Sequence, residues 1–238
     1  VYKDADYILQ IRADNEAAAI HGLYRIARDL GVVYFHPEET FAPFDPGAAL
    51  PWGDGIEFDE PAFQLRGFHE HTQHPIPMSD FLLRPGNDEF RQYVSNYLRW
   101  LARNRQNVLT FHMLKTVDLD AWLPYITDIV EEAHTYGIKV GPVLSFADQQ
   151  QHGFKLISDG ATDEDEQIRS GLSELLAARF DLVGFQIGTS EFTKPDDQQV
   201  LGWLETATSH LAAEHPGGRP VSRIHTTCHL TTDDGGYI

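Results

Sequence analysis

The fold is decided by residues 107–146, NVLTFHMLKTVDLDAWLPYITDIVEEAHTYGIKVGPVLSF. This stretch begins with an apolar run over 108–113, continues with apolar residues at helical spacing over 121–136, and ends in a second apolar run over 139–146. A strand, a helix and a second strand in this order form the unit of a parallel sheet, because parallel neighbours need a long crossover between them. We therefore predict an α/β fold.

The same alternation continues on both sides of this stretch. Further strands are predicted over 63–68, 182–187 and 221–226, and further helices over 89–103, 166–180 and 197–214. An open doubly wound sheet and a (β/α)8 barrel both fit this pattern. No G-x-G-x-x-G follows the first strand, which removes the main support for dinucleotide binding.

The first sixty residues have a different organisation. Alternation over 6–13 predicts a strand, and apolar residues at helical spacing over 16–30 predict a helix that begins after Asn15 and stops at Gly31. A short strand is predicted over 32–35, and the Pro-, Gly- and Asp-rich stretch after it is typical of a connection. We predict a small α/β domain with its linker over 1–60 and a barrel domain over 61–238.

Composition excludes several classes of protein. Hydrophobic residues make up 42% and charged residues 23% of the chain, as in globular proteins. The formal charge of −18 should repel nucleic acid, and no apolar run is long enough to cross a membrane, so neither is expected as a partner. The single cysteine, Cys228, excludes a disulfide framework and a Cys-rich zinc module.

Polar side chains gather where the predicted strands end. In parallel α/β folds the carboxyl edge of the sheet is the face on which active sites are built. The candidates at or near these strand ends are Arg66, His69, Glu70, His71, His112, Lys115, Asp148, Ser190, Glu191, His225 and His229.

Four motifs in order along the chain resemble family 20 glycoside hydrolases, the β-N-acetylhexosaminidases. They are PAFQLRG (61–67), NVLTFH (107–112), YGIKV (136–140) and FQIGTSE (185–191). The segment over 22–43 is similar to the small α/β domain that precedes the barrel in this family and in related α-glucuronidases. The resemblance implies a partial or complete (β/α)8 TIM-type barrel preceded by a small α/β domain.

The resemblance also implies a retaining, substrate-assisted mechanism in which Glu191 is the general acid/base. Ser190 stands where the family has the Asp that supports the substrate's 2-acetamido group. A serine carries no charge to offset a cationic intermediate. Either another carboxylate such as Asp148 or Glu70 supplies the charge, or the substrate is a different sugar, such as a uronic acid, or activity has been lost.

For the carbohydrate substrate, the resemblance and the strand-end positions suggest Arg66, His112, Glu70, His71 and Asp148 as binding residues. Arg66 is the best match, since its forked donors suit sugar hydroxyls. We expect no cofactor and no metal on this hypothesis, and the resemblance suggests a secreted or periplasmic enzyme. The sequence leaves the oligomeric state, the sugar and the linkage open.

Two other hypotheses remain open. Ser190 is compatible with a non-catalytic carbohydrate-binding relative. Alternatively, H-x-H after a first barrel strand also occurs in metal-dependent amidohydrolases, and His69 and His71 on extended backbone point the same way and can share a metal. Further ligands would then come from His225 and His229.

Length adds one expectation. A complete barrel needs eight strands and typically about 250 residues by itself. The region after Pro61 supplies five candidate strands, so we expect the chain to be part of a longer protein, with an open parallel edge that favours association.

Overall fold

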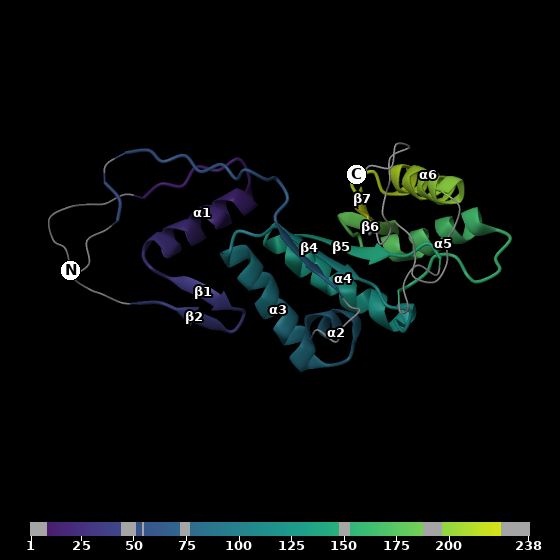
Figure 1. Cartoon of the computed structure of the whole chain (residues 1–238). Coiled ribbons are helices and arrows are strands. Elements are labelled where there is room, and N and C mark those ends of the chain that lie inside the picture. Colours follow the sequence, from purple (N-terminus) through teal and green to yellow (C-terminus); the bar gives the residue numbers. More distant parts are fainter. Residues whose placement is uncertain are drawn as a thin grey trace, which may run out of the picture.

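The computed structural model describes residues 9–43, 51–53, 55–71, 77–147, 153–187 and 197–224 (Figure 1). A five-stranded parallel sheet forms its centre and is built from β3 (Gly67–Glu70), β4 (Val108–His112), β5 (Lys139–Leu144), β6 (Leu182–Ile187) and β7 (Arg219–Ile224). The helices between them are α2 (Pro77–Leu83), α3 (Asp88–Arg103), α4 (Leu119–Thr135), α5 (Glu164–Leu176) and α6 (Asp197–Glu214). The α/β prediction is confirmed, although the short α2 was not predicted.

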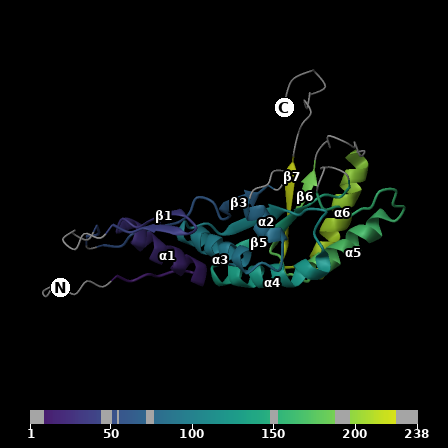
Figure 2. The same ribbon diagram turned by 90° about the horizontal axis from the view of Figure 1, so that it is seen from below.

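The order of the strands decides between the two predicted architectures. The sheet runs β3-β4-β5-β6-β7, so each strand pairs with its neighbours along the chain. A doubly wound sheet would reverse this order at a switch point and carry helices on both faces. Here α3, α4, α5 and α6 follow one face (Figure 2). The sheet is therefore part of a (β/α) barrel, and the doubly wound alternative is wrong.

Alternate residues of each strand point to the helices and form the core. Leu109 and Phe111 of β4 and Phe185 of β6 are fully buried there. The ring of Trp122 on α4 lies 6.2 Å from that of Phe111, and its Nε1 donates to the Leu82 carbonyl of α2 at 2.9 Å. The residues between them point to the opposite face, which we call the inner face of the sheet.

Side chains and backbone geometry set where the helices begin and end. Asn87 caps α3 by accepting from the backbone N–H groups of Glu89 and Phe90, and Asp118 caps α4 in the same way. The helix predicted over 166–180 begins and ends earlier, at Glu164 and Leu176. Soon after its end, Arg179 has a left-handed φ of 57°, which turns the chain toward β6.

The amino-terminal part packs against the outer side of the barrel segment. Its helix α1 (Glu16–Asp29) begins after Asn15 as predicted, and Gly31, at a φ of 89°, follows its end. The predicted strand is present as β1 (Val33–His36), and an unpredicted partner, β2 (Glu39–Phe41), pairs with it. Residues 9–13 form no strand, whereas 6–8 lie outside the described residues.

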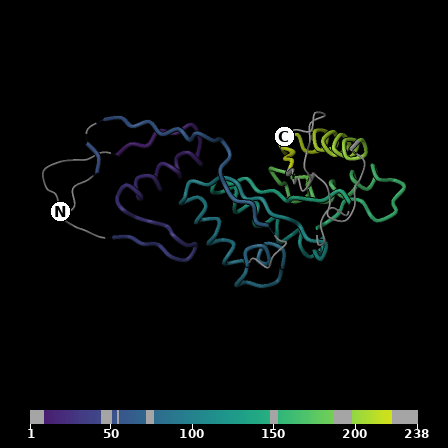
Figure 3. Tube along the Cα trace, viewed as in Figure 1, coloured from purple at the N-terminus to yellow at the C-terminus, as the bar shows by residue number. Residues whose placement is uncertain are grey.

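Contacts with α3 and with the turn that follows it hold this part in place. Trp100 donates from Nε1 to the Tyr34 carbonyl at 3.0 Å, and Arg105 pairs with Asp59 at 2.6 Å. The chain after β2 passes beside α1 before it enters β3 (Figure 3). The division into domains over 1–60 and 61–238 stays a prediction.

Each helix in the described part of the chain falls short of the length and apolarity that a bilayer crossing requires.

The close approach of β5 and β6 gives a test of this packing. A Cβ at Gly141 would lie 2.2 Å from the Leu182 carbonyl oxygen. We expect Gly141→Ala to lower the free energy of unfolding by about 1–3 kcal/mol, the usual cost of overpacking. Gly202→Ala on α6 is the matched control, since nothing lies within 4 Å of its added Cβ, and it should be neutral or stabilising. Urea unfolding followed by circular dichroism measures both, and equal stabilities would contradict the packing described.

Candidate functional site

The carboxyl edge of the sheet carries a buried polar layer on its inner face. His112 at the end of β4, Ser145 just after β5 and Gln186 near the end of β6 are only 2%, 2% and 4% exposed. With Ser79 of α2, they are the buried polar residues among those that the structure describes. Buried polar groups need partners, and their concentration at this edge marks it as the candidate functional site.

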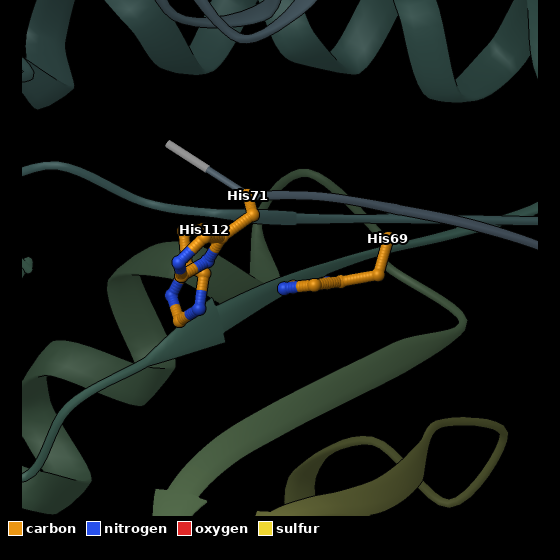
Figure 4. A group of neighbouring side chains, drawn as sticks. All are labelled: His69, His71 and His112. Carbon is orange, nitrogen blue, oxygen red and sulfur yellow. The ribbon is translucent and has the colours of Figure 1, made fainter. Parts of the chain in front are cut away.

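Three histidines meet at the β3 end of this layer. The parallel register pairs His69 with Thr110, so both point to the inner face, and His71 and His112 follow two residues later on the two chains. The ring centroids lie 4.8 Å apart for His69 and His112, 4.9 Å for His71 and His112, and 6.2 Å for His69 and His71. Figure 4 shows the edge of the His69 ring directed at the other two rings.

The ring of His69 is oriented by a hydroxyl on the neighbouring strand. Its Nδ1 lies 3.0 Å from Oγ1 of Thr110. One ligand atom from each of the three histidines lies within 4.8 Å of the others. His112 is buried, whereas His69 and His71 are partly exposed, so the group opens to one side.

Glu70 points away from this group. It is the residue between His69 and His71, so the strand period turns it toward α3, where it accepts a hydrogen bond from the Tyr97 hydroxyl at 2.5 Å. Burial, then this carboxylate, raises the pKa of Tyr97 well above its usual range. The structure therefore does not bring Glu70 to the inner face, as a sugar contact or a source of catalytic charge would require.

Arg66 lies at the opposite end of the sheet from the one predicted. We predicted a strand over 63–68, but β3 begins at Gly67, so Arg66 comes just before the amino end of the strand. Its guanidinium donates to the carbonyl oxygens of Phe63 and Arg105, and burial lowers its pKa. The predicted placement at the carboxyl edge is wrong because these carbonyls hold the side chain at the amino edge. Sugar binding by Arg66 stays a prediction that this placement does not support.

Several predicted site residues lie outside the described residues. They are Asp148, Ser190, Glu191, His225 and His229. Glu191 follows β6, which ends at Ile187. Their roles stay predictions. Lys115 is described and exposed after the end of β4.

Thr110, Ser145 and Gln186 also belong to this site, although none of them was predicted there. A signal for them was present, because each stands an even number of residues from an inner-face position on its own strand: Thr110 from His112, Ser145 from Gly141, and Gln186 from Gly184. Strict alternation in a strand with one helix-covered face would have assigned all three to the inner face.

Comparisons with known proteins give only distant likenesses. No family model and no curated protein matches the chain. A mutant O-GlcNAc hydrolase of Thermobaculum terrenum matches with a TM-score of 0.45 and 13% identity, over 67% of this chain and 35% of that one. A mutant Streptomyces plicatus β-hexosaminidase in complex with GlcNAc matches with a TM-score of 0.44 and 14% identity, over 68% and 39%.

A type I 3-dehydroquinate dehydratase from Clostridium difficile also matches, with a TM-score of 0.37 and 16% identity, over 59% and 45%. The chain thus spans less than half the length of each of these three proteins. At such identities and TM-scores, the likenesses carry no argument about chemistry.

The contact between Glu70 and Tyr97 gives a test of the placement of Glu70. Tyr97→Phe removes a hydrogen bond to a charged acceptor and should lower the free energy of unfolding by about 1.5–3 kcal/mol. Because the two side chains contact each other, the loss in Tyr97→Phe/Glu70→Gln should be smaller than the sum of the single losses. Urea unfolding of the four proteins in the cycle measures this. Strictly additive losses would show that the two groups do not interact.

Proposed function

We propose that the chain provides part of the active site of a glycoside hydrolase, at the carboxyl edge of its parallel sheet, with Glu191 as general acid/base. The observation that supports this best is the buried polar layer of His112, Ser145 and Gln186. An imidazole, a hydroxyl and an amide each offer hydrogen-bond donors and acceptors, which is what sugar hydroxyls require. A surface of uncharged groups that both donate and accept hydrogen bonds therefore suits a ligand with many hydroxyls.

The position of Glu191 in the sequence supports its role as the acid. It follows β6, whose Gln186 already points to the inner face near the carboxyl edge. A glutamic acid that protonates a glycosidic oxygen needs to stay protonated near neutral pH, which requires burial or a neighbouring negative charge. Glu191 therefore needs one of these two conditions to act as the acid.

In this proposal, one candidate remains for the carboxylate that supplies the charge needed by hexosaminidase chemistry. No carboxylate points to the inner face among the strand residues that the structure describes, and Glu70 faces α3. Asp148 and Glu70 were proposed to replace the Asp that the family has at the position of Ser190. Of these two, Asp148 is therefore the one to test. If Asp148 has no effect, a substrate without a 2-acetamido group fits the site better.

A non-catalytic carbohydrate-binding relative is the second candidate. Two observations favour it. Ser190 stands where the family has its supporting Asp, and no carboxylate points to the inner face among the described strand residues. It predicts that the protein binds sugar through the polar layer and hydrolyses none.

A panel of aryl glycosides, including 2-acetamido sugars and uronic acids, tests the proposal on the intact protein. We expect turnover of at least one glycoside, and we expect Glu191→Gln to lower kcat/KM by about 10²–10⁴-fold, as for the loss of a general acid. Glu174→Gln, an exposed change of the same chemistry on α5, is the control and should leave kcat/KM unchanged. Asp148→Asn should lower the rate only with 2-acetamido substrates.

Three outcomes separate the candidates. Turnover that Glu191→Gln does not change would contradict its role as the acid. Absence of turnover together with sugar binding, measured by calorimetry, would establish the binding relative in place of the hydrolase. Absence of both would contradict a carbohydrate site.

A further inference from the structure

We propose that His69, His71 and His112 bind one Zn²⁺ ion through their imidazole nitrogens, at the carboxyl ends of β3 and β4. This goes beyond the glycosidase proposal, which expects no metal, and does not depend on Glu191. It also differs from the metal site considered from the sequence, because the third ligand comes from β4 and not from His225 or His229.

The backbone brings the three side chains together by ordinary sheet geometry. His69 and His71 are two residues apart on extended backbone, so both point to the inner face. His112 is two residues beyond Thr110, the register partner of His69, and therefore points to the same face from the adjacent strand. Neighbouring strands lie about 4.8 Å apart, which lets imidazoles from two strands converge on one point.

The distances are close to those of a bound site. One nitrogen from each histidine lies within 4.8 Å of the other two. Tetrahedral zinc with Zn–N bonds of about 2.0–2.1 Å separates its nitrogen ligands by about 3.4 Å. Side-chain rotations that move each nitrogen by about 1 Å close this difference, and the partial exposure of His69 and His71 leaves room for them.

A contact of the kind that supports metal-binding histidines is already in place. Metal ligands usually hold their second ring nitrogen by a hydrogen bond, which fixes the tautomer and the ring orientation. Nδ1 of His69 lies 3.0 Å from the Thr110 hydroxyl. When Nδ1 donates its hydrogen to that oxygen, Nε2 carries the lone pair that a metal needs. We assign Thr110 as the positioning residue for His69.

The donor set selects the class of metal. Imidazole nitrogen suits zinc and its neighbours among the transition metals, whereas Mg²⁺ and Ca²⁺ require oxygen ligands. No carboxylate points to the inner face among the strand residues that the structure describes, so three neutral ligands would leave the ion its full positive charge. The fourth coordination position then remains for water or for a substrate oxygen, as in catalytic zinc sites.

Zinc binding by the whole protein tests this proposal directly. The protein is purified without a polyhistidine tag, treated with EDTA and titrated with ZnCl₂ in a calorimeter, and bound zinc is counted by mass spectrometry. We expect one Zn²⁺ for each chain. His69→Ala, His71→Ala and His112→Ala should each weaken binding by more than about 100-fold, beyond the 10–100-fold typical of a lost outer-shell contact. His134→Ala, on an exposed histidine, and His210→Ala, on a partly exposed one, both lie outside this group; they are the controls and should leave affinity unchanged.

The Thr110 variants keep the test valid if a histidine variant fails to fold. Thr110→Val keeps the shape of the side chain but removes the hydroxyl, and we expect zinc affinity to fall by about 10-fold. Thr110→Ser keeps the hydroxyl and should restore zinc affinity.

Cobalt as a replacement metal gives a second measurement. The wild type should show the visible absorption of a tetrahedral cobalt site, and His112→Ala should lose this absorption. Absence of stoichiometric zinc, or equal affinity in the wild type and the histidine variants, would overturn the proposal. Because no turnover is measured, failure here is distinct from failure of the glycosidase proposal.

Discussion

The structure depends on the two-residue period of strands whose outer face is covered by helices. Once Leu109 and Phe111 must be buried under the helices, Thr110 and His112 must point the other way. The parallel register then carries this division across the sheet, strand by strand. Apolar residues are thus collected on one side and polar residues on the other, and a shift of one residue in any strand would exchange them.

Much of the fold could be predicted because its signals are local. The capping side chains of Asn15 and the periodic apolar residues of α1, α3 and α4 are read from short windows of sequence. The end of α5 could not be predicted so closely. The left-handed residue after it is Arg179 and not a glycine, which is the usual sequence signal for such a turn. The strand expected over 6–13 is not seen in residues 9–13, which pair with none of the strands in the described part of the chain.

The candidate site was harder to predict than the fold. The sequence shows which residues lie near the ends of strands. It does not show at which end or on which face each side chain lies, because that depends on the first and last paired residues of the strand. Arg66 was assigned to the wrong end because β3 begins at Gly67, four residues later than the predicted strand and just after Arg66. Glu70 was grouped with the histidines on either side of it, although alternation alone turns it to α3. His112 was expected at the site and lies there, but its proximity to His69 follows from a register that no single strand contains.

The place of β3 in the sheet has a consequence for dynamics. It is a short strand at the end of the strand order, so among the described strands only β4 is hydrogen-bonded to it. Edge strands open more readily than central ones, and local opening here would carry His69 and His71 away from His112 together. What keeps the strand docked lies on its other face, where Phe68 contacts Trp100 and Glu70 meets Tyr97. The rate of amide hydrogen exchange in β3 would thus measure how often His69 and His71 separate from His112. Contacts on the opposite, helix-facing side of the strand would set that rate.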